Sequence, residues 1–385
     1  MIGITKMITG EATVSKRLTY GDDAKIPKKL VEFSRSLIPI VVWNITLKCN
    51  LKCLHCYASA GDKNKDELKT EDCLNIIDQL SEIKVPTILF SGGEPLLRHD
   101  IYEIAEYATS KNINCVLSTN GTLITPEIAE KLKNAGFIYV GVSIDGLENT
   151  HDKFRGCKGS FEKAVQGLIN VKEVGILSGI RFTVTKHNIK DVEPVINLLT
   201  ENDIPRFCLY HLVPSGRAEF EYDITNAERR RLIDFLFNKS LELVESGYKT
   251  EIMTVDNPAD GVYVYLRLKE IDEDLANSAL EFLRYRGGDS SGIRLANIDA
   301  FGKLHPNQFW WDYTIGDLRE KTFKELWFGD DDLLVKLRNK SKFLKGKCKI
   351  CKFKDVCGGF RLRALRAGDL WREDPDCYLR FDEIA

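Results

Sequence analysis

The strongest constraint on the fold is a regular alternation of strand-like and helix-like segments from residue 38 to about residue 215. The first strand, IPIVVWNIT, is a nearly continuous apolar run rich in β-branched residues, which is typical of a strand buried on both faces. About six strand–helix units follow one another. Such alternation predicts an α/β fold with a parallel sheet and external helices, and six units are too few for a closed eight-stranded barrel. We therefore expect a curved, partly open barrel.

Unusual polar segments follow directly after the predicted strands. They are CNLKCLHCY after the first strand, SGGEP after the second, STNGT after the third, SIDG after the fourth and YHLVPSGR after the sixth. The carboxyl ends of parallel strands lie at one edge of the sheet, where active sites of such folds form. The placement of these segments therefore predicts one site at that edge.

Three cysteines, Cys49, Cys53 and Cys56, stand in the first of these segments with the spacing C-x3-C-x2-C, and no fourth cysteine is near. Three thiolates can bind three irons of a [4Fe–4S] cubane and leave the fourth iron free for another ligand. A zinc site completed by His55 or by a distant residue is the alternative. The incomplete thiolate set thus favours a catalytic cluster.

A second group of cysteines lies near the C-terminus. Cys348, Cys351 and Cys357 have the spacing C-x2-C-x5-C, and Cys377 follows after nineteen further residues. Four thiolates saturate a second [4Fe–4S] cluster or a zinc ion, and spacing alone does not separate the two. The remaining four of the eleven cysteines stand singly and are expected to pack in the core.

Composition narrows the class of protein. The formal net charge is −2, which gives no reason to expect a nucleic-acid or acidic-membrane partner. No apolar run reaches the length of about 18 residues that a membrane span needs, and the N-terminus lacks a signal-peptide core. We expect a cytoplasmic protein, and in that compartment clustered cysteines favour metal binding over disulfides.

The C-x3-C-x2-C motif with an aromatic residue after its last cysteine resembles the signature of the radical S-adenosylmethionine (SAM) superfamily. The resemblance implies that SAM binds the free iron and is cleaved to a 5′-deoxyadenosyl radical. It implies SAM contacts from Tyr57, Gly92, Gly93, Glu94, Ser118, Asn120, Ser143, Asp145 and Arg155. Among them Arg155 would pair with the SAM carboxylate. Ordinary turn or cap chemistry is the alternative for each polar loop taken alone.

The C-terminal segment resembles the SPASM extension that follows many radical SAM cores, but it departs from that pattern. Asn307 and Arg361 stand where the pattern usually has cysteines. The resemblance then implies one auxiliary [4Fe–4S] cluster, bound by the four C-terminal cysteines and serving electron transfer, with a purely structural role as the alternative. The expected organisation is an N-terminal extension (1–37), a partial (β/α)6 radical SAM core (38–225), a helical connection (226–290) and a SPASM- or twitch-like domain (291–385).

The segments GGDSSG, HPNQFWW, GGFRLRA and EDPDCYL look like the tetrapyrrole-modifying branch of the superfamily. This implies removal of two acetate side chains from 12,18-didecarboxysiroheme to give Fe-coproporphyrin III in heme biosynthesis, with an external electron donor such as a ferredoxin or flavodoxin. The alternatives are a heme d1 enzyme that converts propionates to oxo groups, a peptide-modifying SPASM maturase, and a non-catalytic iron–sulfur carrier.

Several basic residues are candidates for binding such a substrate. We expect arginines to bind its carboxylates and a histidine to supply an axial ligand for its iron. The candidates are Arg284, Arg286, Arg294, Arg361, Arg363, Arg366, His211 and His305.

Overall fold

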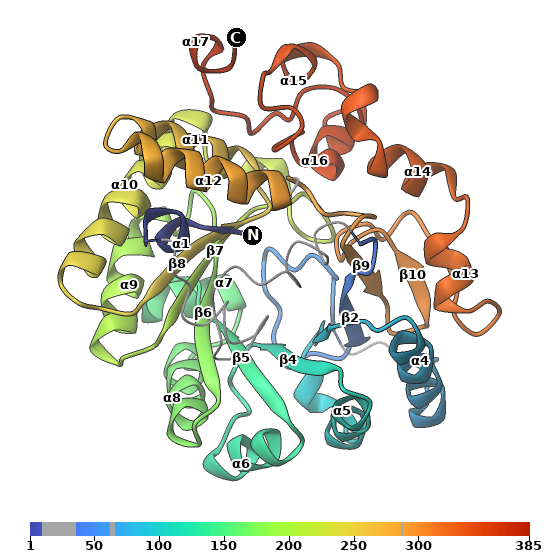
Figure 1. Ribbon diagram of the computed structural model, residues 1–385. Helices are drawn as coiled ribbons and strands as arrows, with labels where there is room; N and C mark the ends of the chain where they lie inside the picture. Colours follow the sequence, from blue (N-terminus) through green and yellow to red (C-terminus); the bar gives the residue numbers. More distant parts are fainter. Residues whose placement is uncertain (10–35, 62–65, 287) are drawn as a thin grey trace.

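The computed structural model describes residues 1–9, 36–61, 66–286 and 288–385. Most of the expected N-terminal extension, 1–37, lies outside these residues. Within them the strands form one sheet with the order β1-β8-β7-β6-β5-β4-β3-β2-β9-β10-β11. Figure 1 shows the strands curving around a centre with helices on the outside.

The six predicted strands are present and adjacent strands pair in parallel, which confirms the expected α/β class. These strands are β2 (Ile40–Thr46), β3 (Thr87–Gly92), β4 (Asn114–Thr119), β5 (Phe137–Ser143), β6 (Leu177–Val184) and β7 (Arg206–His211). The helices that cover them are α4 (Thr70–Glu82), α5 (Ile101–Ser110), α6 (Pro126–Asn134), α7 (Glu148–Arg155), α8 (Ser160–Glu173) and α9 (Val192–Glu201).

Helix α6 illustrates how the sequence sets the element ends. The hydroxyl of Thr125 accepts a hydrogen bond from the backbone N–H of Ile128, and Pro126 occupies the first helical position. Gly136 ends the turn after the helix with a φ of +85°, a conformation that glycine adopts without steric cost. Thr125 therefore caps the start of α6, and the turn to β5 is short.

The parallel part of the sheet is longer than predicted. Strand β8 (Glu251–Val255) pairs in parallel with β7, and β9 (Leu295–Ile298) pairs in parallel with β2. Antiparallel strands β1 (Ile2–Gly3), β10 (Lys303–His305) and β11 (Gly316–Asp317) complete the two ends. The described residues therefore contain eight consecutive parallel strands instead of six.

The segment 226–290 is not only a helical connection, because it contains β8. The strand is short and begins with a charged residue, Glu251, so the sequence gives only a weak strand signal. In the structure the carboxylate of Glu251 accepts hydrogen bonds from Arg206 of β7 at 2.9 and 2.6 Å, and Arg206 lies 5.0 Å from the ring centre of Tyr139. The buried charge is thus neutralised by a partner 45 residues earlier in the chain.

The remaining helices lie before, within and after this segment. They are α1 (Ile4–Thr9), α10 (Asn226–Glu245), α11 (Ala259–Lys269), α12 (Glu273–Arg286), α13 (Phe323–Phe328), α14 (Asp332–Arg338), α15 (Gly346–Ile350), α16 (Arg361–Arg366) and α17 (Phe381–Ile384). Short 3-10 turns cover Pro95–Leu97, Ile189–Asp191, Phe220–Tyr222 and Lys340–Lys342. The C-terminal region packs on α10, where Arg230 forms an ion pair with Glu383 at 2.6 Å.

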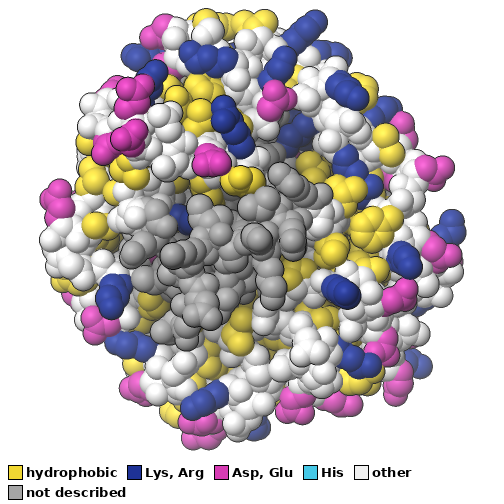
Figure 2. Space-filling view, in the orientation of Figure 1, with side chains coloured by type: hydrophobic (Ala, Val, Ile, Leu, Met, Phe, Trp, Pro, Cys, Tyr) yellow, Lys and Arg dark blue, Asp and Glu magenta, His cyan; other side chains and the backbone are white. Residues whose placement is uncertain are grey.

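The distribution of surface charge and the composition of the helices limit the kinds of partner that the protein can bind. Figure 2 shows basic and acidic side chains interspersed over the face seen in Figure 1. None of the helices in the described residues combines the length and the apolar composition needed to cross a membrane.

Candidate functional site

A cavity of about 1060 Å³ opens at the carboxyl ends of the parallel strands, and Cys49, Cys53 and Cys56 all line it. The three cysteines lie in the loop that follows β2. Seven of the nine residues predicted to contact SAM line the same cavity: Tyr57, Gly92, Gly93, Ser118, Asn120, Ser143 and Arg155. The structure therefore brings the predicted segments of four different strand ends together.

The cysteine loop is held by close backbone contacts that only glycine permits. Gly93 donates its N–H to the carbonyl of Thr46 at 2.7 Å, and a Cβ at Gly93 would lie 2.1 Å from the carbonyl oxygen of Lys48. On the other side, a Cβ at Gly216 would lie 2.4 Å from the carbonyl oxygen of Cys56. Backbone approach at both ends of the loop fixes the spacing of the thiols.

Glu94 does not line the cavity. Its buried carboxylate accepts hydrogen bonds from the backbone N–H groups of Leu96 at 3.2 Å and Asn120 at 2.8 Å, and from the hydroxyl of Thr119 at 2.8 Å. Burial raises the pKa of Glu94, and these hydrogen bonds oppose the rise. In this geometry Glu94 joins the ends of β3 and β4, and its contact with SAM stays a prediction.

Arg155 forms a buried ion pair with Asp145, and its Nη1 lies 3.6 Å from the sulfur of Cys53. Burial alone would raise the pKa of Asp145, but Arg155, His55 and the backbone N–H of Thr183 together outweigh burial, so the pKa lies below the ordinary value. His55 lies 3.6 Å from Asp145 and packs on Phe154. Burial lowers the pKa of His55 to about 4, so this imidazole is neutral at pH 7.

Tyr57, directly after the third cysteine, contacts both polar and aromatic neighbours of the cysteine loop. The hydroxyl of Tyr57 donates to Asn44 at 2.9 Å and lies 3.1 Å from the hydroxyl of Ser91. Its ring meets Phe309 edge-on, with 5.2 Å between ring centres. Tyr57 therefore connects the cysteine loop to the C-terminal region.

The four C-terminal cysteines line a second cavity, of about 370 Å³. Burial raises the pKa of Cys377 to about 11, as it raises that of Cys49 in the first cavity to about 12. Thiolates enclosed in this way need cationic partners, which metal binding supplies. Nowhere in the described residues do three or more His, Cys, Asp or Glu side chains approach closely enough to bind one metal ion. The metal of each thiol set stays a prediction.

Asn307 and Arg361, at the positions where cysteines were expected by the SPASM pattern, are part of hydrogen-bond networks. The amide of Asn307 donates to the hydroxyl of Ser291 at 2.7 Å. Arg361 donates to the carbonyl oxygens of Leu370 at 3.0 Å and Arg372 at 2.8 Å. At these two positions the chain therefore has side chains that bind other parts of the protein in place of cysteine thiols.

None of the candidate carboxylate-binding arginines whose side chains are described lines the first cavity, and their contact with substrate stays a prediction. Arg363 is buried and forms an ion pair with Asp376 at 2.6 Å, and Arg366 pairs with Asp312 at 2.7 Å. Arg294 donates to the carbonyl of Tyr285 at 2.6 Å. The side chain of Arg284 is exposed, and that of Arg286 is not among the side chains that the structure describes.

The two candidate axial histidines are also engaged within the protein. His211 lines the first cavity, but its ring nitrogens contact Asp260 at 2.8 Å and Arg229 at 3.3 Å. His305 contacts Asp299 at 3.2 Å and the carbonyl of Tyr313 at 2.7 Å. Neither imidazole is free to bind iron in this geometry.

Sequence reasoning gave no individual role to several polar residues that line the first cavity, among them Arg181, Tyr210, Asp256 and Gln308. An arginine inside the apolar strand GIRFTVT was a usable signal for Arg181. Asp256 follows β8, which the sequence did not reveal, so its position at a strand end was hidden.

Comparisons with known proteins place these features in context. Residues 43–199 match the radical SAM superfamily. The chain is 44% identical to Fe-coproporphyrin III synthase of Methanosarcina barkeri, over all of this chain and 99% of that protein. It is 40% identical to pre-heme d1 synthase of Dinoroseobacter shibae, over 90% of this chain and 88% of that protein.

Among solved structures, the fold is similar to that of Streptococcus suis SuiB bound to S-adenosylmethionine. The TM-score is 0.71 at 20% identity, covering 91% of this chain and 80% of SuiB. At this identity the likeness concerns the fold, including the extension beyond the barrel.

Proposed function

Because the chain belongs to the radical SAM superfamily, we propose that it removes two acetate side chains from 12,18-didecarboxysiroheme to give Fe-coproporphyrin III in heme biosynthesis. The observation that carries the proposal is the 44% identity to an Fe-coproporphyrin III synthase over essentially both whole chains. The cavity at the strand ends supports the radical chemistry of the proposal, because the three cysteines line it together with residues from the ends of β3, β4 and β5.

The family uses a [4Fe–4S] cluster and SAM, and the thiols of Cys49, Cys53 and Cys56 would bind that cluster. When bound, the reduced cluster and SAM supply a 5′-deoxyadenosyl radical that takes a hydrogen atom from the substrate. The remaining predicted contacts would orient SAM: the backbone at Gly92 and Gly93, and the side chains at the ends of β4 and β5. Tyr57 and Phe309 would exclude water from the cluster loop.

Cys348, Cys351, Cys357 and Cys377 would bind an auxiliary [4Fe–4S] cluster. With four protein ligands such a cluster has no free iron for substrate, so electron transfer is its proposed role. An external donor such as a ferredoxin or flavodoxin would supply electrons. A cytoplasmic location belongs to the same proposal.

The test is anaerobic turnover of the reconstituted protein with SAM, dithionite and 12,18-didecarboxysiroheme. Mass spectrometry follows 5′-deoxyadenosine and the tetrapyrrole. Loss of two acetate units together with 5′-deoxyadenosine is the expected result. Formation of 5′-deoxyadenosine with an unchanged tetrapyrrole would refute the substrate while keeping the radical chemistry.

A second candidate is the heme d1 reaction, favoured by the 40% identity to a pre-heme d1 synthase. The same assay separates the two reactions, because loss of propionates instead of acetates changes the product mass differently. Detection of the propionate-derived product would replace the first proposal by the second.

A further inference from the structure

Two side chains in the wall of the first cavity carry polar groups that the protein itself leaves without a partner. The guanidinium of Arg181, on β6, makes no hydrogen bond or ion pair within the described part of the chain, and it stacks on Tyr210 with 4.3 Å to the ring centre. The Oδ2 atom of Asp256, just after β8, is buried and accepts no hydrogen bond. Both residues line the cavity that contains the three cysteines.

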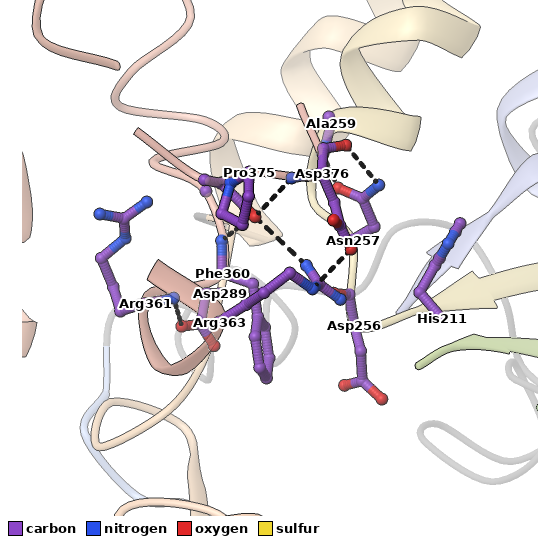
Figure 3. Close-up of polar contacts among 12 residues, drawn as sticks. His211, Asp256, Asn257, Ala259, Asp289, Phe360, Arg361, Arg363, Pro375 and Asp376 are labelled. Atoms are coloured by element: carbon purple, nitrogen blue, oxygen red, sulfur yellow. Dashed lines mark hydrogen bonds and ion pairs between the residues drawn. The ribbon is translucent and has the colours of Figure 1, made fainter. Parts of the chain in front are cut away.

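The backbone of Asp256 is held by a hydrogen bond, whereas the Oδ2 atom of its carboxyl group accepts none. Its φ is +67°, in the left-handed region that few residues other than Gly, Asn and Asp adopt. Its carbonyl oxygen accepts a hydrogen bond from Arg363 at 2.9 Å. Figure 3 shows this contact and shows the carboxyl group of Asp256 directed away from Arg363. A strained, anchored residue with a free polar end is a common device at binding sites.

We propose that Arg181 and Asp256 together bind a carboxylate of the ligand in this cavity, with Arg181 providing the charge and the protonated carboxyl group of Asp256 donating a hydrogen bond. A cation enclosed without a counter-ion is costly, and an incoming carboxylate removes that cost. The inference rests on the proposed function, because the tetrapyrrole supplies several carboxylates. SAM also carries one, and the experiment distinguishes the two sources.

The charges around Asp256 agree with a protonated form near neutral pH. Burial raises the pKa of Asp256 to about 7. The amino group of Met1, Arg363 and Arg181 lower it, and Asp289 raises it further. Above this pKa two carboxylates would face each other, so ligand binding should weaken as the pH rises.

The first experiment measures binding by the anaerobically reconstituted holoenzyme. Absorbance titration follows 12,18-didecarboxysiroheme, and equilibrium dialysis follows SAM separately. In Arg181→Gln, tetrapyrrole binding should weaken about 10- to 100-fold, as for loss of a charged hydrogen bond. SAM binding should stay unchanged. The matched control is Arg319→Gln, because Arg319 is exposed and pairs only locally with Asp317. Circular dichroism and iron content verify that each variant is folded.

The second experiment uses Asp256→Asn, which keeps a neutral hydrogen-bond donor and tolerates the left-handed backbone. Wild-type affinity for the tetrapyrrole should fall by up to about 30-fold between pH 6 and pH 8.5, as a single group of pKa about 7 loses its proton. The Asn variant should lose most of this pH dependence. Asp332→Asn, at an exposed surface pair, should retain the wild-type profile.

The outcomes separate the inference from the proposed function. Wild-type protein that does not bind the tetrapyrrole would refute the proposed function. Wild-type binding with equal affinity in Arg181→Gln, or with an unchanged pH profile in Asp256→Asn, would overturn the inference alone. Weakened SAM binding with intact tetrapyrrole binding would assign the carboxylate to SAM and overturn the tetrapyrrole as its source.

Discussion

The Nη2 atom of Arg363 donates a hydrogen bond to the carbonyl oxygen of Asp256 at 2.9 Å, and so joins helix α16 to the end of strand β8 (Figure 3). The same atom donates to the carbonyl of Leu212, after β7, at 3.2 Å. The guanidinium also pairs with Asp376 at 2.6 Å. One buried arginine therefore connects the C-terminal region to two neighbouring ends of the barrel strands.

Replacing this arginine should destabilise the protein strongly. Arg363→Gln leaves the buried carboxylate of Asp374 without its cation and Asp376 with only Arg229 among the described residues, at a cost of about 3 to 5 kcal/mol. Urea denaturation of anaerobically reconstituted protein measures the loss. Arg366→Gln is the control, because its partner Asp312 is more than half exposed and such pairs contribute about 0 to 1 kcal/mol. Equal unfolding midpoints for the two variants would contradict the structural role of Arg363.

The glycine that supports the cysteine loop should not tolerate a methyl group. In Gly93→Ala the new Cβ would lie 2.1 Å from the carbonyl oxygen of Lys48, next to Cys49, so the loop must move. We expect reduced iron incorporation at the first cluster and loss of SAM cleavage. Gly61→Ala is the matched control, because its Cβ would meet no atom within 4 Å. Normal SAM cleavage by Gly93→Ala would show that the loop does not depend on this contact.

Removing the three thiols of the first loop separates an enzyme from an iron–sulfur carrier. The triple variant Cys49→Ala, Cys53→Ala, Cys56→Ala should lose about four irons per chain and all formation of 5′-deoxyadenosine. Iron analysis and mass spectrometry measure the two effects. Cys157→Ala, outside both thiol sets, should behave as the wild type. Residual SAM cleavage in the triple variant would argue against a cluster at this loop.

Removing a thiol of the second set should leave the first cluster in place. In Cys357→Ser we expect the iron content to fall from about eight towards about four per chain, because a cubane binds about four irons and loses a ligand here. Single-turnover cleavage of SAM with dithionite should persist, whereas the complete reaction should slow if electrons pass through the second cluster. An unchanged iron content would show that Cys357 is not a ligand. A zinc content of one ion per wild-type chain would replace the auxiliary cluster by a zinc site.

The sequence by itself determined the order of strands and helices in the core and the grouping of polar segments at one edge of the sheet. These follow from local signals: apolar runs such as IPIVVWNIT, the cap at Thr125, and short motifs at strand ends. The spacing of the three cysteines belongs to the same class, since a loop of eight residues brings its own side chains together. Local patterns of this kind carry their structural meaning without knowledge of distant contacts.

Only the tertiary structure decided where charged residues are paired. Strand β8 escaped prediction because it is short and begins with the charged Glu251, whose partner Arg206 is known only from the fold. Arg363 looked like a ligand-binding residue because its partners Asp374 and Asp376 give no pairing signal in the sequence. Conversely, Arg181 and Asp256 line the cavity without a polar side-chain partner. The physical reason is that a buried charge without a partner costs much free energy, whereas a paired one does not. Burial and pairing both depend on residues that only the fold brings together.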